Sequence, residues 1–65
     1  MKEYYFQING KDAITGIQGE YHAMTRAVNV EAAAVKVKSY YSDVIGWKGM
    51  NPETYSEKSK YKYVV

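Results

Sequence analysis

The feature that most constrains this chain is its short length, together with the lack of residues that could form a disulfide or a metal site. It has 65 residues, no cysteine and a single histidine, His22. A chain of this length buries only about 60% of the surface that its unfolded form exposes. Neither a disulfide nor a cysteine- or histidine-based metal site can add to its stability. The fold must therefore depend on one small apolar core, and we expect residues 1–65 to form a single domain.

Composition and the N-terminal sequence predict where such a chain works. Hydrophobic residues make up 46% of the chain, which is ordinary for a globular domain and too high for disorder. No window approaches the roughly 18 apolar residues that are needed to span a bilayer. Residues Met1–Phe6 lack the apolar stretch of a secretory signal, and the lack of cysteine fits a reducing compartment. The sequence therefore predicts a cytoplasmic protein with no membrane partner.

The N-terminal part has the pattern of a β-hairpin. Residues Glu3–Ile8 are rich in strand-favouring aromatic side chains and end at Asn9-Gly10, a dipeptide typical of tight hairpin turns. A second strand is expected to begin at Ala13. Gly16 and Gly19 then predict a bulge or bend within it.

Residues 20–29 are compatible with two structures. An apolar stripe at helical spacing allows one helix over Glu20–Ile45, whereas the β-branched residues and Asn29 favour a strand to about Val28. Asn29 has the chemistry of a helix N-cap, with Glu31 in the first turn. We prefer a strand followed by a helix over Val30–Ile45.

The apolar side of that helix is expected to contain Ala33, Ala34, Val37, Tyr40, Tyr41 and Val44. Gly46 is expected to close the helix, because glycine readily adopts the left-handed conformation found there. Residues 47–54 then form a connection in which Asn51 caps a turn beginning at Pro52.

The C-terminal residues 59–65 alternate as in a strand. The alternation places Tyr61, Tyr63 and Val65 on the inward face and Lys60, Lys62 and Val64 on the outward face. The predicted fold is a small α+β domain of ββαβ order, with one helix packed on a three-stranded, mainly antiparallel sheet.

The sequence contains no arrangement typical of an enzyme. His22 has no cysteine partner, and the serines lack the glycines of a nucleophile elbow. The carboxylates lack calcium-loop spacing, and Gly16-Ile17-Gln18-Gly19 lacks the lysine and third glycine of phosphate loops. We therefore expect a non-enzymatic protein without catalytic residues, metal or cofactor. The role of His22 stays open.

The net charge of +2 is concentrated at one end of the chain. Residues 48–65 carry four lysines and two glutamates, whereas basic and acidic residues cancel in residues 1–47. Lysines alternate with tyrosines over Lys58–Tyr63, a pattern that can bind phosphates while rings stack on bases. In a strand, however, the two residue types point to opposite sides. We prefer the interpretation that the lysines keep a terminal strand from edge-to-edge aggregation, with contacts to phosphates or to a protein as the alternatives.

Aromatic residues are more numerous than one small core requires. The chain has eight tyrosines, one tryptophan and one phenylalanine. Exposed tyrosine and tryptophan are enriched in interfaces, although they can also cover a thin core. Together with the basic segment, they give the following candidate binding residues: Trp47, Lys48, Tyr55, Lys58, Lys60 and Lys62.

The layout of the chain resembles small phage-encoded accessory proteins, among them certain anti-CRISPR proteins. The resemblance is carried by Tyr4–Ile8, the Asn9-Gly10 turn, the helix start at Asn29–Ala33 and the terminal Lys/Tyr strand. It implies a stoichiometric inhibitor that occupies a site on a larger protein or nucleoprotein complex in the host cytoplasm. It carries over no functional residue.

Two other functions stay open on the residues alone. One is a small nucleic-acid-binding protein that uses Lys58, Lys60 and Lys62. The other is a structural accessory subunit that works as a homo-oligomer. The sequence fixes neither the partner nor the oligomeric state.

Overall fold

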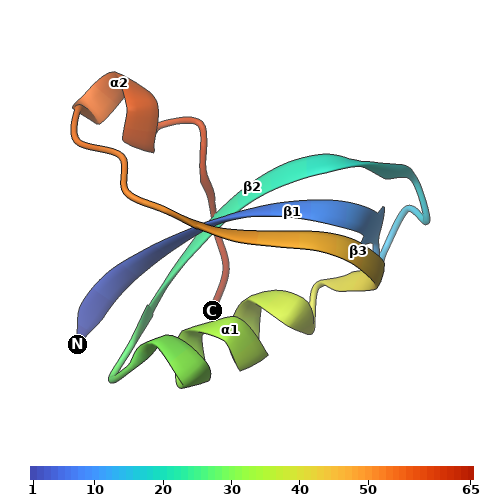
Figure 1. The fold of residues 1–65 in the computed structure, drawn as a ribbon, viewed down its shortest axis with the longest axis horizontal. Coiled ribbons are helices and arrows are strands. Elements are labelled where there is room, and N and C mark those ends of the chain that lie inside the picture. The colour runs from blue at the N-terminus through green and yellow to red at the C-terminus, as the bar shows by residue number, and fades with distance from the viewer.

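A computed structural model describes residues 1–65 and contains four strands and two helices (Figure 1). In chain order these are β1 (Lys2–Asp12), β2 (Gln18–Ala27), α1 (Val30–Lys38), β3 (Tyr41–Met50), α2 (Tyr55–Lys58) and β4 (Lys62–Tyr63). The strands form one sheet in the order β3-β1-β2-β4. β1 is antiparallel to β2 and β3, and β4 is parallel to β2. The α+β class is confirmed, but the three-stranded ββαβ arrangement is incomplete, since it lacks the fourth strand and α2.

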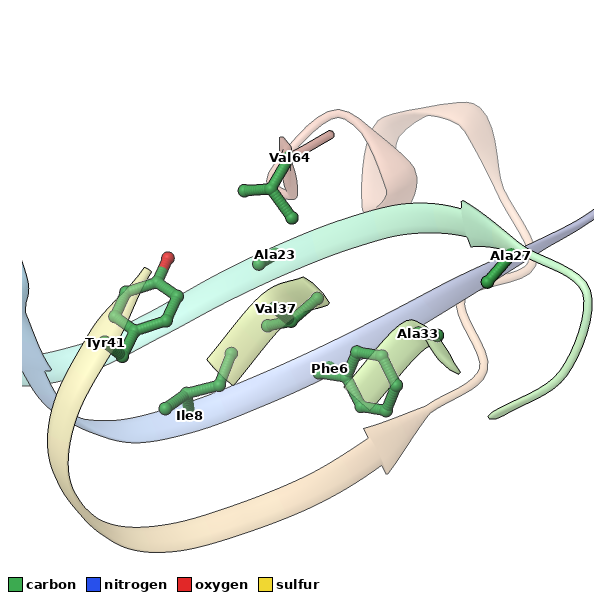
Figure 2. Packing of buried hydrophobic residues seen from close by; sticks show 8 residues of the cluster. All are labelled: Phe6, Ile8, Ala23, Ala27, Ala33, Val37, Tyr41 and Val64. Atoms are coloured by element: carbon green, nitrogen blue, oxygen red, sulfur yellow. The ribbon is translucent and has the colours of Figure 1, made fainter. Parts of the chain in front are cut away.

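Helix α1 packs across one face of the sheet, and the core lies between them (Figure 2). Only 10 of the 65 residues are buried, so this core is a single thin layer. The opposite face has no helix packed across it, and α2 stands to that side, near the end of β3 (Figure 1). Neither helix has the length and apolar character needed to cross a membrane. The buried apolar residues are Phe6, Ile8, Ala23, Ala27, Ala33, Val37, Tyr41 and Val64.

The predicted turn at Asn9-Gly10 is wrong, because β1 continues through both residues. A Cβ at Gly10 would lie 3.0 Å from the Ser42 carbonyl oxygen and 3.1 Å from Val44 Cα. Glycine is therefore needed here for the close approach of β3. The register shifts at this point, where β3 bulges and Asp43 adopts a φ of 49°.

Asp12 organises the turn that joins β1 to β2. Its Oδ1 accepts hydrogen bonds from the amides of Ile14 at 2.8 Å and Thr15 at 3.1 Å. Gly16 follows with a φ of 72°, which suits glycine. β2 consequently begins at Gln18 and not at Ala13.

Residues 20–27 form a strand, and the preferred division between strand and helix is confirmed. Helix α1 begins at Val30, and the Asn29 side chain caps it by accepting a hydrogen bond from the Ala32 amide at 2.8 Å. The N-cap residue Asn29 was therefore sufficient to predict where the helix begins.

The predicted end of the helix at Ile45 is wrong, because α1 stops at Lys38. The Ser39 hydroxyl donates a hydrogen bond to the Lys36 carbonyl at 2.6 Å, within the last turn. The aromatic and β-branched residues that follow favour a strand, and they form β3. Gly46 accordingly lies inside β3, opposite Asn9. Of the expected inner residues, Ala33 and Val37 are buried on α1, Tyr41 is buried on β3, and Ala34, Tyr40 and Val44 are partly buried.

The connection expected over residues 47–54 is also shorter than predicted. Residues 47–50 belong to β3, and the short helix α2 starts after Thr54, whose hydroxyl accepts a hydrogen bond from the Glu57 amide at 3.2 Å. The cap is therefore Thr54, and neither Asn51 nor Pro52 begins this helix.

The C-terminal strand has the opposite facing from the one predicted. Val64 is buried, whereas Tyr63 is 53% and Val65 is 75% exposed. The amide of Val64 donates to the Met24 carbonyl at 2.9 Å, and the Val64 carbonyl accepts from the Thr25 hydroxyl at 2.7 Å. These bonds to β2 fix Val64 on the side of α1.

Candidate binding surface

The uncovered face of the sheet is defined by the strand registers. Side chains alternate along a strand, so the neighbours of the buried residues in β1 and β2 point away from α1. One row across the sheet pairs Met50 with Tyr5, Tyr5 with Met24, and Met24 with Tyr63. We call these four residues the cross-strand row. A continuous strip of aromatic and thioether side chains thus crosses all four strands.

A second group of rings lies beside this row. The Tyr61 ring contacts the Tyr5 ring at a centroid distance of 5.1 Å and an angle of 77°. It contacts the His22 ring at 5.3 Å and 87°. Both contacts are edge-to-face, an arrangement favoured by aromatic quadrupoles. Tyr5, His22 and Tyr61 therefore form an aromatic cluster built from β1, β2 and the C-terminal segment.

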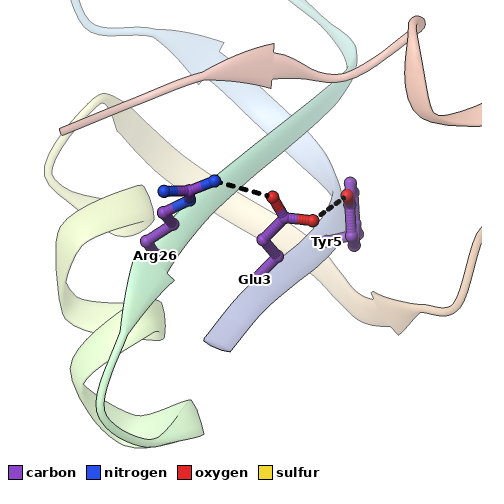
Figure 3. A network of polar contacts seen from close by, with 3 residues as sticks. All are labelled: Glu3, Tyr5 and Arg26. Atoms are coloured by element: carbon purple, nitrogen blue, oxygen red, sulfur yellow. Dashed lines mark hydrogen bonds and ion pairs between the residues drawn. The ribbon is translucent and has the colours of Figure 1, made fainter. Parts of the chain in front are cut away.

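A polar network flanks the cluster on β1 and β2 (Figure 3). The Tyr5 hydroxyl donates a hydrogen bond to Glu3 Oε1 at 2.9 Å, and Arg26 Nη2 lies 3.3 Å from Glu3 Oε2. The hydrogen bond from Tyr5, followed by that from Arg26, lowers the pKa of Glu3. Desolvation, followed by the bond to Glu3, raises the pKa of Tyr5. At neutral pH the phenol is thus held as a donor to a charged carboxylate.

Two hollows open on the uncovered face. One, of about 330 Å³, lies between the aromatic cluster and α2, and its lining includes Glu57 and Lys60. The other, of about 390 Å³, is lined by Glu3, Met24, Arg26 and Tyr63. Both bring charged groups next to rings or thioethers, so a ligand here meets apolar contact area and polar partners together.

The structure distributes the six predicted binding residues over several places. Lys48 is exposed on the uncovered face, in the row of Gln7 and His22. Lys60 lines the hollow beside α2. Tyr55 and Lys58 belong to α2, where Tyr55 is 88% exposed. Their part in binding stays a prediction.

The other two candidates lie elsewhere. Lys62 pairs with the buried Ala23, which places it at the edge of the sheet on the α1 side. Trp47 also lies on that side, where its ring stacks on Phe6 at a centroid distance of 4.5 Å. Lys38 Nζ is 4.7 Å from the centroid of the Trp47 ring. Trp47 therefore covers the core between β3 and α1.

Reasoning from the sequence missed all six residues of the cross-strand row and the aromatic cluster, and it placed Tyr61 and Tyr63 on the inward face. If Phe6 is buried, alternation along the strand is sufficient to predict that its neighbour Tyr5 points outward. The positions of His22, Met24 and Met50 beside it depend on strand registers. Because the turn was predicted at Asn9-Gly10, the observed pairing of β1 with β2 and β3 could not be derived from the sequence.

No group of three or more His, Asp or Glu side chains comes together in a way that could hold a metal ion. The surface consists of rings, thioethers and charges of both signs.

Comparison of the chain with protein-family models, curated proteins and solved structures gave no match.

Proposed function

We propose that this chain is a non-catalytic binding protein that engages a protein partner through the uncovered face of its sheet. The observation that carries the proposal is the cross-strand row, a strip of two tyrosines and two methionines with no helix packed over it. Tyrosine and methionine are enriched in the cores of protein interfaces. A ring has few torsions to immobilise for the area that it buries.

The charges on this face favour a protein over a polyanion. Glu3 lies beside Arg26, and Glu57 lines the same hollow as Lys60. A nucleic-acid strand crossing the face would meet these carboxylates as well as the cations. A protein surface of mixed charge can complement both signs.

The size of the molecule fits a stoichiometric occupant of a larger complex. Its two longest extents are 28 and 24 Å. The area of one whole face is therefore of the same order as the area of about 800 Å² that each partner contributes to a standard interface. A partner that covers most of the face would fit the stoichiometric, phage-type inhibitor that the sequence layout suggests, and we propose this as the kind of binding protein.

A face-specific variant tests the proposal. Tyr63→Glu puts a charge into the exposed end of the cross-strand row, and Val35→Glu puts the same charge on α1, where Val35 is 72% exposed. Affinity purification from the host cells in which the protein is made, with quantitative mass spectrometry, identifies the partner retained by the unaltered protein. We expect Tyr63→Glu to weaken binding of that purified partner at least about tenfold, and Val35→Glu to leave it unchanged. Equal binding by both variants contradicts the proposal.

A second candidate function is the binding of single-stranded nucleic acid. The supporting observation is that Lys48 and Lys60 lie on the same face as the aromatic cluster, which brings cations and rings together. Titration with oligo(dT) and oligo(U) at several salt concentrations tests this function. Binding that weakens steeply with salt, with a slope reduced by about one unit in Lys48→Ala, favours nucleic acid.

A further inference from the structure

One corner of the sheet has an unpaired strand edge. β1 pairs with β2 from Lys2 onward, but it pairs with β3 only from Tyr5, which lies opposite Met50. After Met50 the chain leaves the sheet. Residues 2–4 of β1 therefore have no strand on that side, and their outward backbone groups are open to an added strand.

A hollow of about 440 Å³ lies beside this edge. Its apolar lining includes Tyr4, Phe6, Val30 and Pro52, and Val30 is 49% exposed. Gly49 also lines it, and a Cβ built on Gly49 would meet no atom within 4 Å. The hollow thus has room for a side chain on the side of Gly49.

The unbalanced charge at this hollow is positive. Glu3 lines it, but its carboxylate already binds Arg26 and the Tyr5 hydroxyl. Lys58 of α2 lines it too and belongs to neither of the two ion pairs in the structure, although its charge also helps to lower the pKa of Glu3. An incoming group next to Lys58 is therefore favoured when it is acidic.

We propose that this corner binds an extended segment of the partner protein as a short added strand beside residues 2–4. The proposal rests on the partner being a protein. The open backbone edge matches the main chain of an extended peptide, the hollow at Gly49 takes an apolar side chain, and Lys58 takes a carboxylate. Successive side chains of a strand point to opposite faces, so the apolar and acidic residues of the peptide are adjacent in sequence.

Selection of peptides tests this site without a known partner. A phage-displayed library of random peptides is selected on the immobilised protein, and enriched peptides are synthesised and titrated by fluorescence anisotropy. We expect enrichment of an aliphatic residue next to Asp or Glu. Gly49→Leu fills the hollow and weakens binding at least about tenfold. Lys58→Glu also weakens it, by a factor that shrinks with added salt.

Gly19→Leu is the matched control, because a Cβ at Gly19 makes only ordinary contacts with Tyr21, the nearest at 3.8 Å. Circular dichroism melts check that all three variants fold, and peptide binding to the control is expected to match that of the unaltered protein. Selected peptides that bind Gly49→Leu undiminished overturn the inference, as does a library that yields no enriched peptide.

The purified partner separates this inference from the proposed function. Loss of the partner in both Tyr63→Glu and Gly49→Leu supports both the face and the corner. Loss in Tyr63→Glu alone keeps the proposed function and overturns the corner site. Retention of the partner by both variants overturns both.

Discussion

At the scale of single residues, Gly10 shows how a side chain can be excluded by a neighbouring backbone. The two nearest atoms that a Cβ would meet are the Ser42 carbonyl oxygen and Val44 Cα, which belong to the backbone and cannot rotate away. The bulge of β3 rests directly on this point of β1. The identity of residue 10 therefore helps to fix the path of β3.

We predict that Gly10→Ala destabilises the protein by about 1–3 kcal/mol, because the added methyl forces the two strands apart. Gly19→Ala is the control, since its Cβ makes contacts of ordinary length. Urea unfolding followed by circular dichroism measures both free energies of unfolding. A Gly10→Ala variant as stable as the control contradicts the close approach.

Two carboxylates predict a loss of stability in acid. Backbone hydrogen bonds from Ile14 and Thr15 lower the pKa of Asp12 below 3.8, and Tyr5 and Arg26 lower that of Glu3 below 4.5. A group with a lowered folded-state pKa stabilises the protein above its unfolded pKa, and the contribution is lost as the pH falls through the folded value. We expect the free energy of unfolding to fall below about pH 4.5, with a shallower fall in Asp12→Asn. An Asp12→Asn profile with an unchanged slope excludes Asp12 as a contributor.

Two phenols predict the opposite behaviour in alkali. Desolvation raises the pKa of Tyr5 and Tyr41 above 10.0. Their contribution is complete below the unfolded pKa and is lost as the pH rises through the folded value. We expect melting temperatures to fall above about pH 10, and to fall less in Tyr41→Phe, because that variant cannot ionise there. A Tyr41→Phe variant that matches the unaltered protein across this range excludes Tyr41 as a cause.

At the scale of elements, the boundary of a helix could be predicted from the sequence where a local signal marks it. Asn29 marks the start of α1, because its side chain caps the first turn whatever the rest of the chain does. No such signal marks the end of α1. Tyr41 and Val44 continue the helical spacing of Ala33 and Val37, yet they belong to β3. Pairing with β1 decides their conformation, and that contact is remote in sequence.

The terminal strand shows the same limit on its facing. Side chains alternate between the two faces of a strand whichever face is buried. The alternating pattern therefore predicts a strand but does not show which set of residues points into the core. The parallel pairing with β2 makes the choice, and it selects Val64.

We predict that Val64→Ala lowers the free energy of unfolding by about 1–3 kcal/mol, because it removes buried apolar contacts and leaves a void. Tyr63→Ala is expected to stay within about 0.5 kcal/mol of the unaltered protein, as exposed positions usually do. Thermal and urea unfolding compare the two. A larger loss in Tyr63→Ala would restore the facing predicted from the sequence.

At the scale of the whole molecule, the sheet order explains which parts of the surface were predictable. The α+β class followed from local patterns, since aromatic runs favour strands and the alanine-rich segment favours helix. The cross-strand row depends on three registers at once, and one of them is a parallel pairing of residues far apart in the chain. Basic residues were identifiable as candidates, but their grouping with His22 and Tyr61 required the folded sheet.

The position of Trp47 has a consequence for spectroscopy. It is the only tryptophan, and it stacks on Phe6 on the side of the sheet that packs against α1. Its emission therefore reports unfolding of the core. Selective excitation of this single tryptophan thus follows the unfolding of one defined part of the core, between β3 and α1.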